Sequence, residues 1–246
     1  MKIKKYKYLS NGRYKVYFDD KDYIIYEDVI LKYNILSKEN ISENELNIYL
    51  ENNNYYDCYY NAIKYIKTKL RCEKELRMQM KKSLYSKDII DKVIKKLRDE
   101  GYLNDEIYVK CYINDQINLK TTGPLKIKKD LLSLGIDENI INENITIFTN
   151  DLETEKITKI INKEINLNKN KSNYFLKQKI YNNLIQKGYH SSIIKDCLDN
   201  ISIDDEKIYQ SEYKKLYDKY KNKYDENRLD FVIKSKLYQK GFKIKD

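Results

Sequence analysis

Most of the side chains in this sequence that could do chemistry are cations, which suit the binding of phosphate or of an acidic protein surface. The candidates lie in three stretches: Lys64, Lys67, Lys69, Arg71, Lys74, Lys126, Lys128, Lys129, Lys177 and Lys179. The first stretch has helical or near-helical spacing, and the second falls in the first turn of an expected helix. Because a helix start favours anions, cations there are locally unfavourable and suggest an anionic partner. The alternative is that they are exposed lysines that contribute only solubility.

Other chemistry is poorly represented. The single histidine, His190, has no recognisable set of catalytic partners, so we expect a surface residue at a helix entrance. Asp19, Asp20 and Asp22 lack the pattern of a calcium loop, which favours a solvated turn over a metal site. We therefore expect a protein that is not an enzyme and that holds no metal or other cofactor.

The cysteine pattern and the hydropathy favour a location in the cytoplasm. None of the four cysteines forms a C-x-x-C pair, which argues against a zinc site or a disulfide framework and favours free thiols. No apolar run approaches the roughly 20 residues that span a bilayer. The first residues lack an apolar signal region. We expect a cytoplasmic protein with no membrane partner.

The formal net charge of +10 is unevenly distributed. Residues 60–130 hold 18 basic and 10 acidic side chains, residues 131–155 hold none and 6, and residues 156–190 hold 8 and 1. Basic segments can neutralise phosphates and release counterions, whereas acidic segments would repel DNA and could face a protein. Lys-rich helices also have solvated faces, so charge alone leaves contact with nucleic acid open.

The elements that would position these residues begin with a small sheet. Asn11-Gly12 separates two runs rich in Tyr and β-branched residues, which is a strong hairpin signal, and 23–26 favours a third strand. Ser42 and Glu45 have the spacing of a capping box, which predicts a short helix that ends near residue 52.

From residue 55 onward the sequence repeats. The repeated turn position is occupied by Leu84, Gly135, Gly188 and Gly241, at spacings of 51, 53 and 53 residues. Apolar residues stand four and eight positions before each of them, and an Ile-Ile pair stands five and six positions after the first three. This pattern predicts a helical stripe that ends at a glycine turn. Ser86, Asp137 and Ser191 stand where the next helix should have its N-cap.

A period of about 50 residues indicates a repeat architecture with room for three short helices in each unit. In the first unit we expect helices over 55–69, 72–83 and 87–100. With only 6 Gly and 1 Pro, an all-β fold is disfavoured. We predict a mostly α fold in which tandem three-helix repeats form an elongated curved molecule, with a small N-terminal β-sheet or hairpin. The expected segments are 1–54 (hairpin and short helix), 55–104, 105–150 and 151–203 (three repeats), and 204–246 (a partial fourth repeat).

Several motifs in register carry a resemblance to a known family. They are RCEKEL (71–76), GYLNDE (101–106), GPLKIKKDL (123–131), GI (135–136) and KGY (187–189). Their order and spacing resemble the RecX family of recombinase regulators over roughly residues 55–200, and Arg71 matches the family motif directly. Cys72 stands where the family usually has a Ser cap, Leu84 where a glycine is usual, and Ser83 replaces a basic residue.

The resemblance implies a function. It implies docking along the groove of the RecA recombinase filament, contact with single- and double-stranded DNA, and modulation, usually inhibition, of strand exchange, ATP hydrolysis and co-protease activity. The setting would be DNA repair and recombination, including the SOS response, and we expect a monomer. Two alternatives stay open: a sequence-tolerant DNA-binding helical protein without a recombinase partner, or a helical scaffold for another protein.

Overall fold

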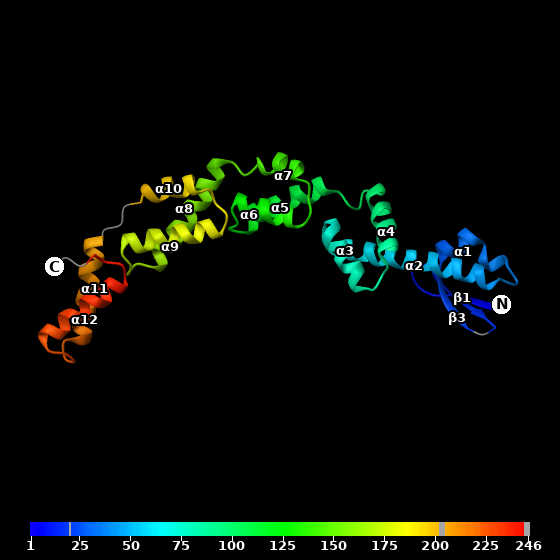
Figure 1. The fold of residues 1–246 in the computed structure, drawn as a ribbon, viewed down its shortest axis with the longest axis horizontal. Coiled ribbons are helices and arrows are strands. Elements are labelled where there is room, and N and C mark those ends of the chain that lie inside the picture. Colours follow the sequence, from blue (N-terminus) through cyan, green and yellow to red (C-terminus); the bar gives the residue numbers. More distant parts are fainter. Residues whose placement is uncertain (20, 202–204, 244–246) are drawn as a thin grey trace. The chain divides into compact units, whose positions relative to one another are not determined.

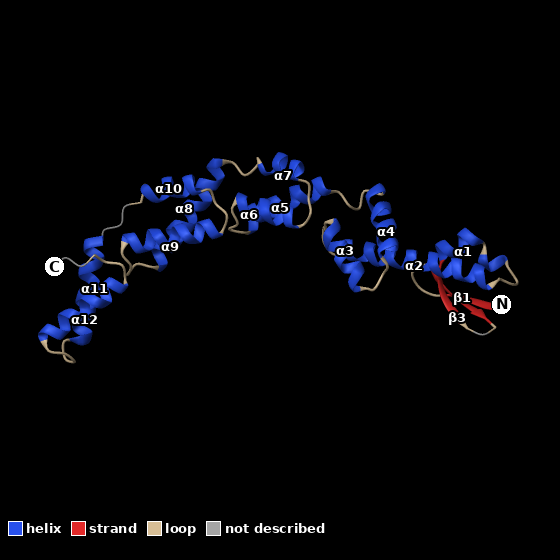
Figure 2. Ribbon diagram, in the orientation of Figure 1, coloured by secondary structure: helices blue, strands red, loops and turns tan. Residues whose placement is uncertain are grey.

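The structure, a computed structural model, describes residues 1–19, 21–201 and 205–243. It divides into two compact units, Met1–Tyr108 and Val109–Asp246 (Figure 1). Within the described residues, strands occur only in the first unit, and helices make up most of both units (Figure 2). The expected mostly α fold with a small N-terminal sheet is confirmed.

The sheet is antiparallel, with the order β1 (Ile3–Tyr8), β2 (Arg13–Phe18) and β3 (Asp22–Tyr26). Asn11 and Gly12 form the predicted hairpin turn with φ angles of 61° and 64°. Asn and Gly tolerate this left-handed region better than other residues, which is why the turn forms here. The predicted third strand is confirmed as well.

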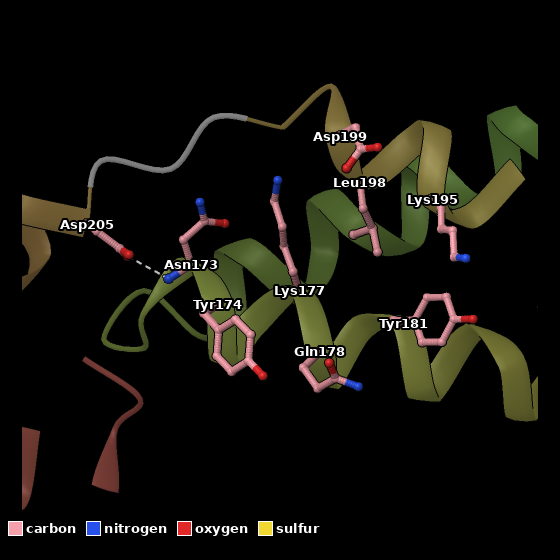
Figure 3. A pocket seen from close by; sticks show the side chains of 9 residues that line it. All are labelled: Asn173, Tyr174, Lys177, Gln178, Tyr181, Lys195, Leu198, Asp199 and Asp205. Carbon is pink, nitrogen blue, oxygen red and sulfur yellow. Dashed lines mark hydrogen bonds between the residues drawn. The ribbon is translucent and has the colours of Figure 1, made fainter. Parts of the chain in front are cut away.

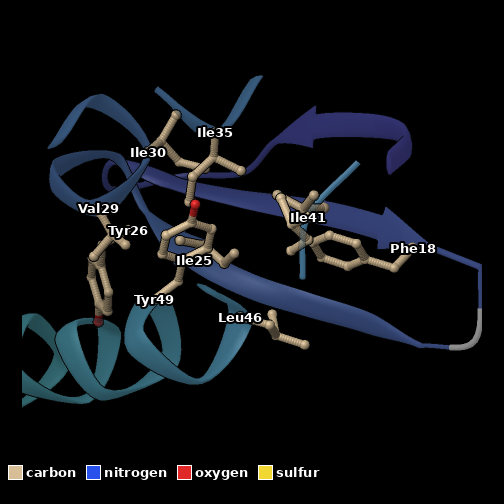
Figure 4. Packing of buried hydrophobic residues seen from close by; sticks show 10 residues of the cluster. Phe18, Ile25, Tyr26, Val29, Ile30, Ile35, Ile41, Leu46 and Tyr49 are labelled. Carbon is tan, nitrogen blue, oxygen red and sulfur yellow. The ribbon is translucent and has the colours of Figure 1, made fainter. Parts of the chain in front are cut away.

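One face of the sheet packs against α1 (Glu27–Tyr33), a short 3-10 helix (Ile35–Ser37) and the start of α2 (Glu43–Ile66). Figure 4 shows the apolar side chains that meet there. Val16, Ile25, Val29 and Ile35 are fully buried in this core. The first 54 residues therefore contribute a hydrophobic core of their own.

Helix α2 is continuous over 24 residues, so the expectation of two separate helices, one ending near 52 and one beginning at 55, was wrong. The capping box at its start is confirmed: the Glu45 N–H donates to Ser42 Oγ at 3.2 Å, and the Ser42 N–H donates to Glu45 Oε2 at 2.8 Å. Three consecutive asparagines at 52–54 have modest helix propensity, which suggested a break. Packing overrides that preference, since Leu46 lies in the N-terminal core and Ala62 in the next core along the chain.

The repeated helices follow the predicted order. The C-terminal half of α2 is followed by α3 (Glu73–Lys82) and α4 (Lys87–Asp99), and then by α5 (Asp105–Leu119), α6 (Pro124–Ser133), α7 (Glu138–Ile145), α8 (Asn150–Leu167), α9 (Asn173–Gln186), α10 (Ser191–Asp199), α11 (Asp205–Tyr220) and α12 (Glu226–Gln239). The described residues thus form three helix triplets and a further pair. Ile244, in the last copy of the repeated motif, lies outside the described residues.

The repeated turn has the predicted backbone in every copy. Leu84, Gly135, Gly188 and Gly241 have φ angles of 64°, 79°, 84° and 86°. A left-handed conformation is costly for a residue with a side chain, so Leu84 is strained where the other copies have glycine. Its side chain finds no compensation in packing, since the residue is 92% exposed.

The helix after each turn begins as expected in two of three copies. Ser86 Oγ accepts the Ile89 N–H, and an Asp137 side-chain oxygen accepts the Asn139 N–H. Ser191 was predicted as the third N-cap, and this was wrong, because His190 is the N-cap and Ser191 is the first residue of α10. No side chain caps α10, but the N–H of the N-cap residue His190 donates to Glu153 Oε1 on α8 at 2.7 Å.

In the unit Val109–Asp246, the second helix of a repeat begins against the glycine turn of the following repeat. This holds for α6 and for α9. The Gly123 N–H before α6 donates to Lys187 O at 2.8 Å, and the Ser172 N–H before α9 donates to Lys240 O at 3.2 Å. A Cβ on Gly188 would lie 2.4 Å from the Lys126 backbone N, so only glycine permits this approach. These contacts fix where α6 and α9 begin, and therefore where their lysines project.

Candidate nucleic-acid and protein interface

The structure separates the predicted basic residues into those with acidic partners and those without. Arg71 Nη1 lies 3.3 Å from Glu75 Oε1, and its guanidinium stacks over the Tyr65 ring at 4.1 Å. Its side chain is only 15% exposed. Lys69 Nζ lies 3.8 Å from the same carboxylate and stays largely exposed. Arg71 therefore holds the loop before α3 in place.

Two further predicted lysines link neighbouring helices. Lys128 on α6 lies 2.8 Å from Glu138 on α7 and donates to Asn142 Oδ1 at 2.9 Å. The hydrogen bond from Lys128 lowers the pKa of Glu138 below its ordinary value. Lys179 on α9 lies 3.2 Å from Glu164 on α8 and donates to Asn168 Oδ1 at 3.0 Å.

Most of the other predicted lysines are available to a partner. Five of them have no ion pair and no side-chain hydrogen bond within the described part of the chain: Lys64, Lys67, Lys126, Lys129 and Lys177. All but Lys177, which is half-buried, are exposed. Lys74 is also exposed, on α3, and interacts with another side chain or charge. The five form the unpaired lysine set, and they occur in all three of the predicted stretches.

Lys177 lies in a groove between α9 and α10 with a volume of about 580 Å³ (Figure 3). Tyr174 and Tyr181 line it from α9, and Lys195 lines it from α10. The groove also contains Asp199 and Asp205, so its net charge is close to neutral. Asp205 accepts the Asn173 N–H at 2.5 Å, which ties the start of α11 to the start of α9.

Lys64 and Lys67, near the C-terminal end of α2, line a second pocket, of about 460 Å³, together with Arg13 from the sheet. Sequence reasoning missed Arg13 and Lys195 because neither belongs to a recognised basic stretch. Arg13 does follow the Asn-Gly turn directly, and that place in a hairpin is the one feature that could have drawn attention to it.

The residues considered for catalysis or metal binding have structural partners. His190 Nδ1 lies 2.8 Å from Oε2 of Glu153, which is 1% exposed. Asp19 accepts the Lys2 N–H at 2.9 Å, Asp22 pairs with Lys15 at 3.1 Å, and Asp20 lies outside the described residues. Among the residues that the structure describes, no group of three or more His, Cys, Asp or Glu could hold a metal ion. None of the described helices is long and apolar enough to cross a membrane.

Comparison with known proteins identifies the family. A sequence model of the RecX first three-helix domain matches residues 58–97. The regulatory protein RecX of Bacillus cytotoxicus is 30% identical over 245 residues, covering 96% of this chain and 90% of that protein. The RecX of Bacillus thuringiensis subsp. konkukian is 30% identical over the same shares. The chain belongs to the RecX family.

RecX crystal structures agree with the fold. The crystal structure of one regulatory protein RecX matches with a TM-score of 0.69 at 24% identity, over 81% of this chain and 100% of that one. RecX from Lactobacillus salivarius matches with a TM-score of 0.55 at 30% identity, over 60% of this chain and 98% of that one. The expected tandem three-helix fold is thus that of RecX, and the chain is a member of a family of regulatory proteins.

Proposed function

We propose that this RecX-family protein regulates the RecA recombinase by binding the RecA filament on DNA, and that it inhibits strand exchange and ATP hydrolysis. It would act in DNA repair and recombination in the cytoplasm, as a monomer and without enzymatic activity of its own. Family membership supports a regulatory role, and the resemblance of the repeat motifs supports RecA as the partner.

The observation that carries the proposal is the unpaired lysine set. It recurs in successive repeats at Lys64 and Lys67, at Lys126 and Lys129, and at Lys177. A filament presents the same surface many times, so a repeat protein can meet it with several weak contacts whose effects multiply. Binding a partner through unpaired cations costs little free energy within the protein, because no internal ion pair has to break.

The test is DNA-dependent ATP hydrolysis by RecA on single-stranded DNA, titrated with this protein. We expect strong inhibition well below one molecule for each RecA monomer, because one bound molecule spans several repeating sites. Unchanged hydrolysis with intact DNA binding would contradict the proposal in favour of a sequence-tolerant DNA-binding protein. Unchanged hydrolysis without DNA binding would leave a helical scaffold for another protein.

A further inference from the structure

The pocket between the N-terminal sheet and the end of α2 concentrates positive charge. Its lining includes Arg13, Lys64 and Lys67 and contains no acidic side chain. None of the three cations forms an ion pair with any described residue. Cations that lie together without ion pairs repel one another, so an anion that enters the pocket relieves that repulsion.

The position of Arg13 is fixed by the hairpin. The Leu9 N–H donates to Arg13 O, and the Glu27 N–H at the start of α1 donates to Gly12 O, both at 2.7 Å. The sheet is in turn attached to α2 through Asn53. The Tyr26 N–H donates to Asn53 Oδ1 at 2.8 Å, and Asn53 Nδ2 donates to Ile24 O at 2.9 Å. Hydrogen bonds between the sheet and α2 therefore hold Arg13 in a fixed position relative to the two lysines.

Two stacked tyrosines complete the lining. The rings of Tyr26 and Tyr60 lie 5.1 Å apart with an interplanar angle of 24°. Figure 4 shows Tyr26 extending from the sheet towards α2, where its hydroxyl donates to Asp57 at 2.8 Å. The Tyr60 hydroxyl donates to Asp28 at 2.7 Å. Burial and the hydrogen bond to Asp57 raise the pKa of Tyr26 to about 12, so this ring stays neutral beside the cations.

We infer that this pocket binds the phosphate backbone of single-stranded DNA through Arg13, Lys64 and Lys67. The guanidinium of Arg13 matches a phosphate in shape and charge, and the two lysines add point charges. Tyr60 is 40% exposed beside them, so part of its ring is accessible to a sugar or base, and cations next to an accessible aromatic ring are the combination found in single-strand binding sites. The inference rests on the proposed function and adds the N-terminal sheet to its binding surface.

The experiment is fluorescence anisotropy of a labelled oligothymidylate with the full chain, measured across a range of salt concentrations. The pocket variant combines Arg13→Gln, Lys64→Gln and Lys67→Gln. If three phosphate contacts are lost, the slope of log K against log salt should become shallower by about 2, and affinity at low salt should fall roughly tenfold or more.

The matched control combines Lys7→Gln, Lys81→Gln and Lys82→Gln. These three exposed lysines lie in the same unit, outside the pocket, and form no ion pair among the described residues. The control should keep most of the wild-type slope. An equal loss in both variants would overturn the inference, because total charge alone would then explain binding. An unchanged slope in the pocket variant would overturn it as well.

Two other outcomes would show that the pocket binds a ligand other than single-stranded DNA. If the pocket variant loses binding to RecA filaments but keeps its slope on bare DNA, the pocket meets an acidic protein surface and the DNA assignment fails. Displacement of the oligonucleotide by inorganic phosphate at constant ionic strength would replace the strand with a free phosphate ligand. Absence of DNA binding by the wild-type chain would overturn the inference. The proposed function is tested separately, by the effect of the protein on ATP hydrolysis by RecA.

The pocket variant should melt like the wild type, because the three side chains form no ion pair. If it melts lower, the variant with only Lys64→Gln and Lys67→Gln repeats the test with both changes at exposed residues, one in the last turn of α2 and one at its C-cap. The expected change in slope is then about two thirds as large.

Discussion

Helices α3 and α9 occupy the same place in their repeats but differ in whether their charged side chains form ion pairs. At the start of α3, Glu73 pairs with Arg77 at 2.5 Å and also with Arg98, and Glu75 pairs with Arg71. Helix α9 contains no acidic residue at all, and Lys177 faces a groove without an ionic partner. The count of basic residues in a segment therefore says little about how much of that charge a partner can reach.

The largest effect is expected where α3 is made to resemble α9. Glu73→Ala removes the carboxylate between Arg77 and Arg98, and because this carboxylate is largely buried the loss should lower the free energy of unfolding by about 2 kcal/mol. Urea denaturation measures the change. DNA affinity should rise slightly, because Arg98 is freed while Arg77 keeps its ion pair with Asp91.

Asp99→Ala is the control for that change. It removes one negative charge from the same repeat at an exposed residue that makes no ion pair among the described residues. If it costs as much stability as Glu73→Ala, the pairing at the start of α3 is not what stabilises this repeat.

The second effect concerns Glu212 on α11, a buried carboxylate that pairs with two cations as Glu73 does at the start of α3. Glu212 is 5% exposed and pairs with Lys240 and, at 2.7 Å, with Lys215. Burial opposes ionisation of Glu212, but the hydrogen bonds from the two lysines outweigh it and lower the pKa.

The sign of the pH dependence follows from the lowered pKa. The contribution of Glu212 is fully present above the unfolded pKa of about 4.3 and is lost as pH falls through the lower folded pKa. Glu212→Gln should therefore cost about 1–2 kcal/mol at neutral pH and clearly less near pH 3. Denaturation at the two pH values measures this difference, and an equal loss at both would contradict the ionic role.

A third, smaller effect separates two neighbouring lysines of α9. Lys177→Gln should weaken binding to RecA–DNA filaments about threefold to tenfold without changing the melting temperature, since one unpaired contact is lost. Lys179→Gln should leave binding unchanged and cost at most about 1 kcal/mol of stability, because its pair with Glu164 is partly exposed. Equal effects of the two variants on binding would contradict the claim that the unpaired lysine contributes to binding and the paired lysine does not.

The smallest effect tests the turn before α4. Leu84→Gly should stabilise the protein by about 0.5–1 kcal/mol, because relief of the left-handed strain exceeds the added flexibility of the unfolded chain. Thermal denaturation gives the sign. Gly135→Ala is the opposite change at the matching turn, where a Cβ meets no atom within 4 Å, so it should destabilise through strain alone.

Much of the fold could be predicted because it depends on local pattern. The apolar stripe before each turn is buried in all four copies, as Leu76, Ile127, Ile180 and Ile233 illustrate. The Asn-Gly hairpin and the capping box at Ser42 follow from backbone preference and from side-chain reach over three residues. The continuity of α2 could not be predicted, because two separate cores stabilise a stretch of asparagines that does not favour a helix.

The candidate site was less predictable because ion pairs between helices depend on packing. The partner of Lys128 lies on α7, and that of Lys179 lies on α8, at sequence separations that no helical spacing indicates. The pair of Arg71 with Glu75 is different, since it has the i,i+4 spacing that the sequence displays. That one pairing could have been found in advance.

The most direct test compares two triple variants that remove the same charge from the same three stretches. One combines Lys64→Gln, Lys126→Gln and Lys177→Gln, and the other combines Arg71→Gln, Lys128→Gln and Lys179→Gln. Binding to RecA filaments on single-stranded DNA is measured beside the melting temperature of each variant. The first should lose binding by about a hundredfold and melt normally, whereas the second should melt lower and bind nearly as the wild type. Equal losses of binding in both, or a larger loss in the second, would contradict the claim that unpaired cations carry the function.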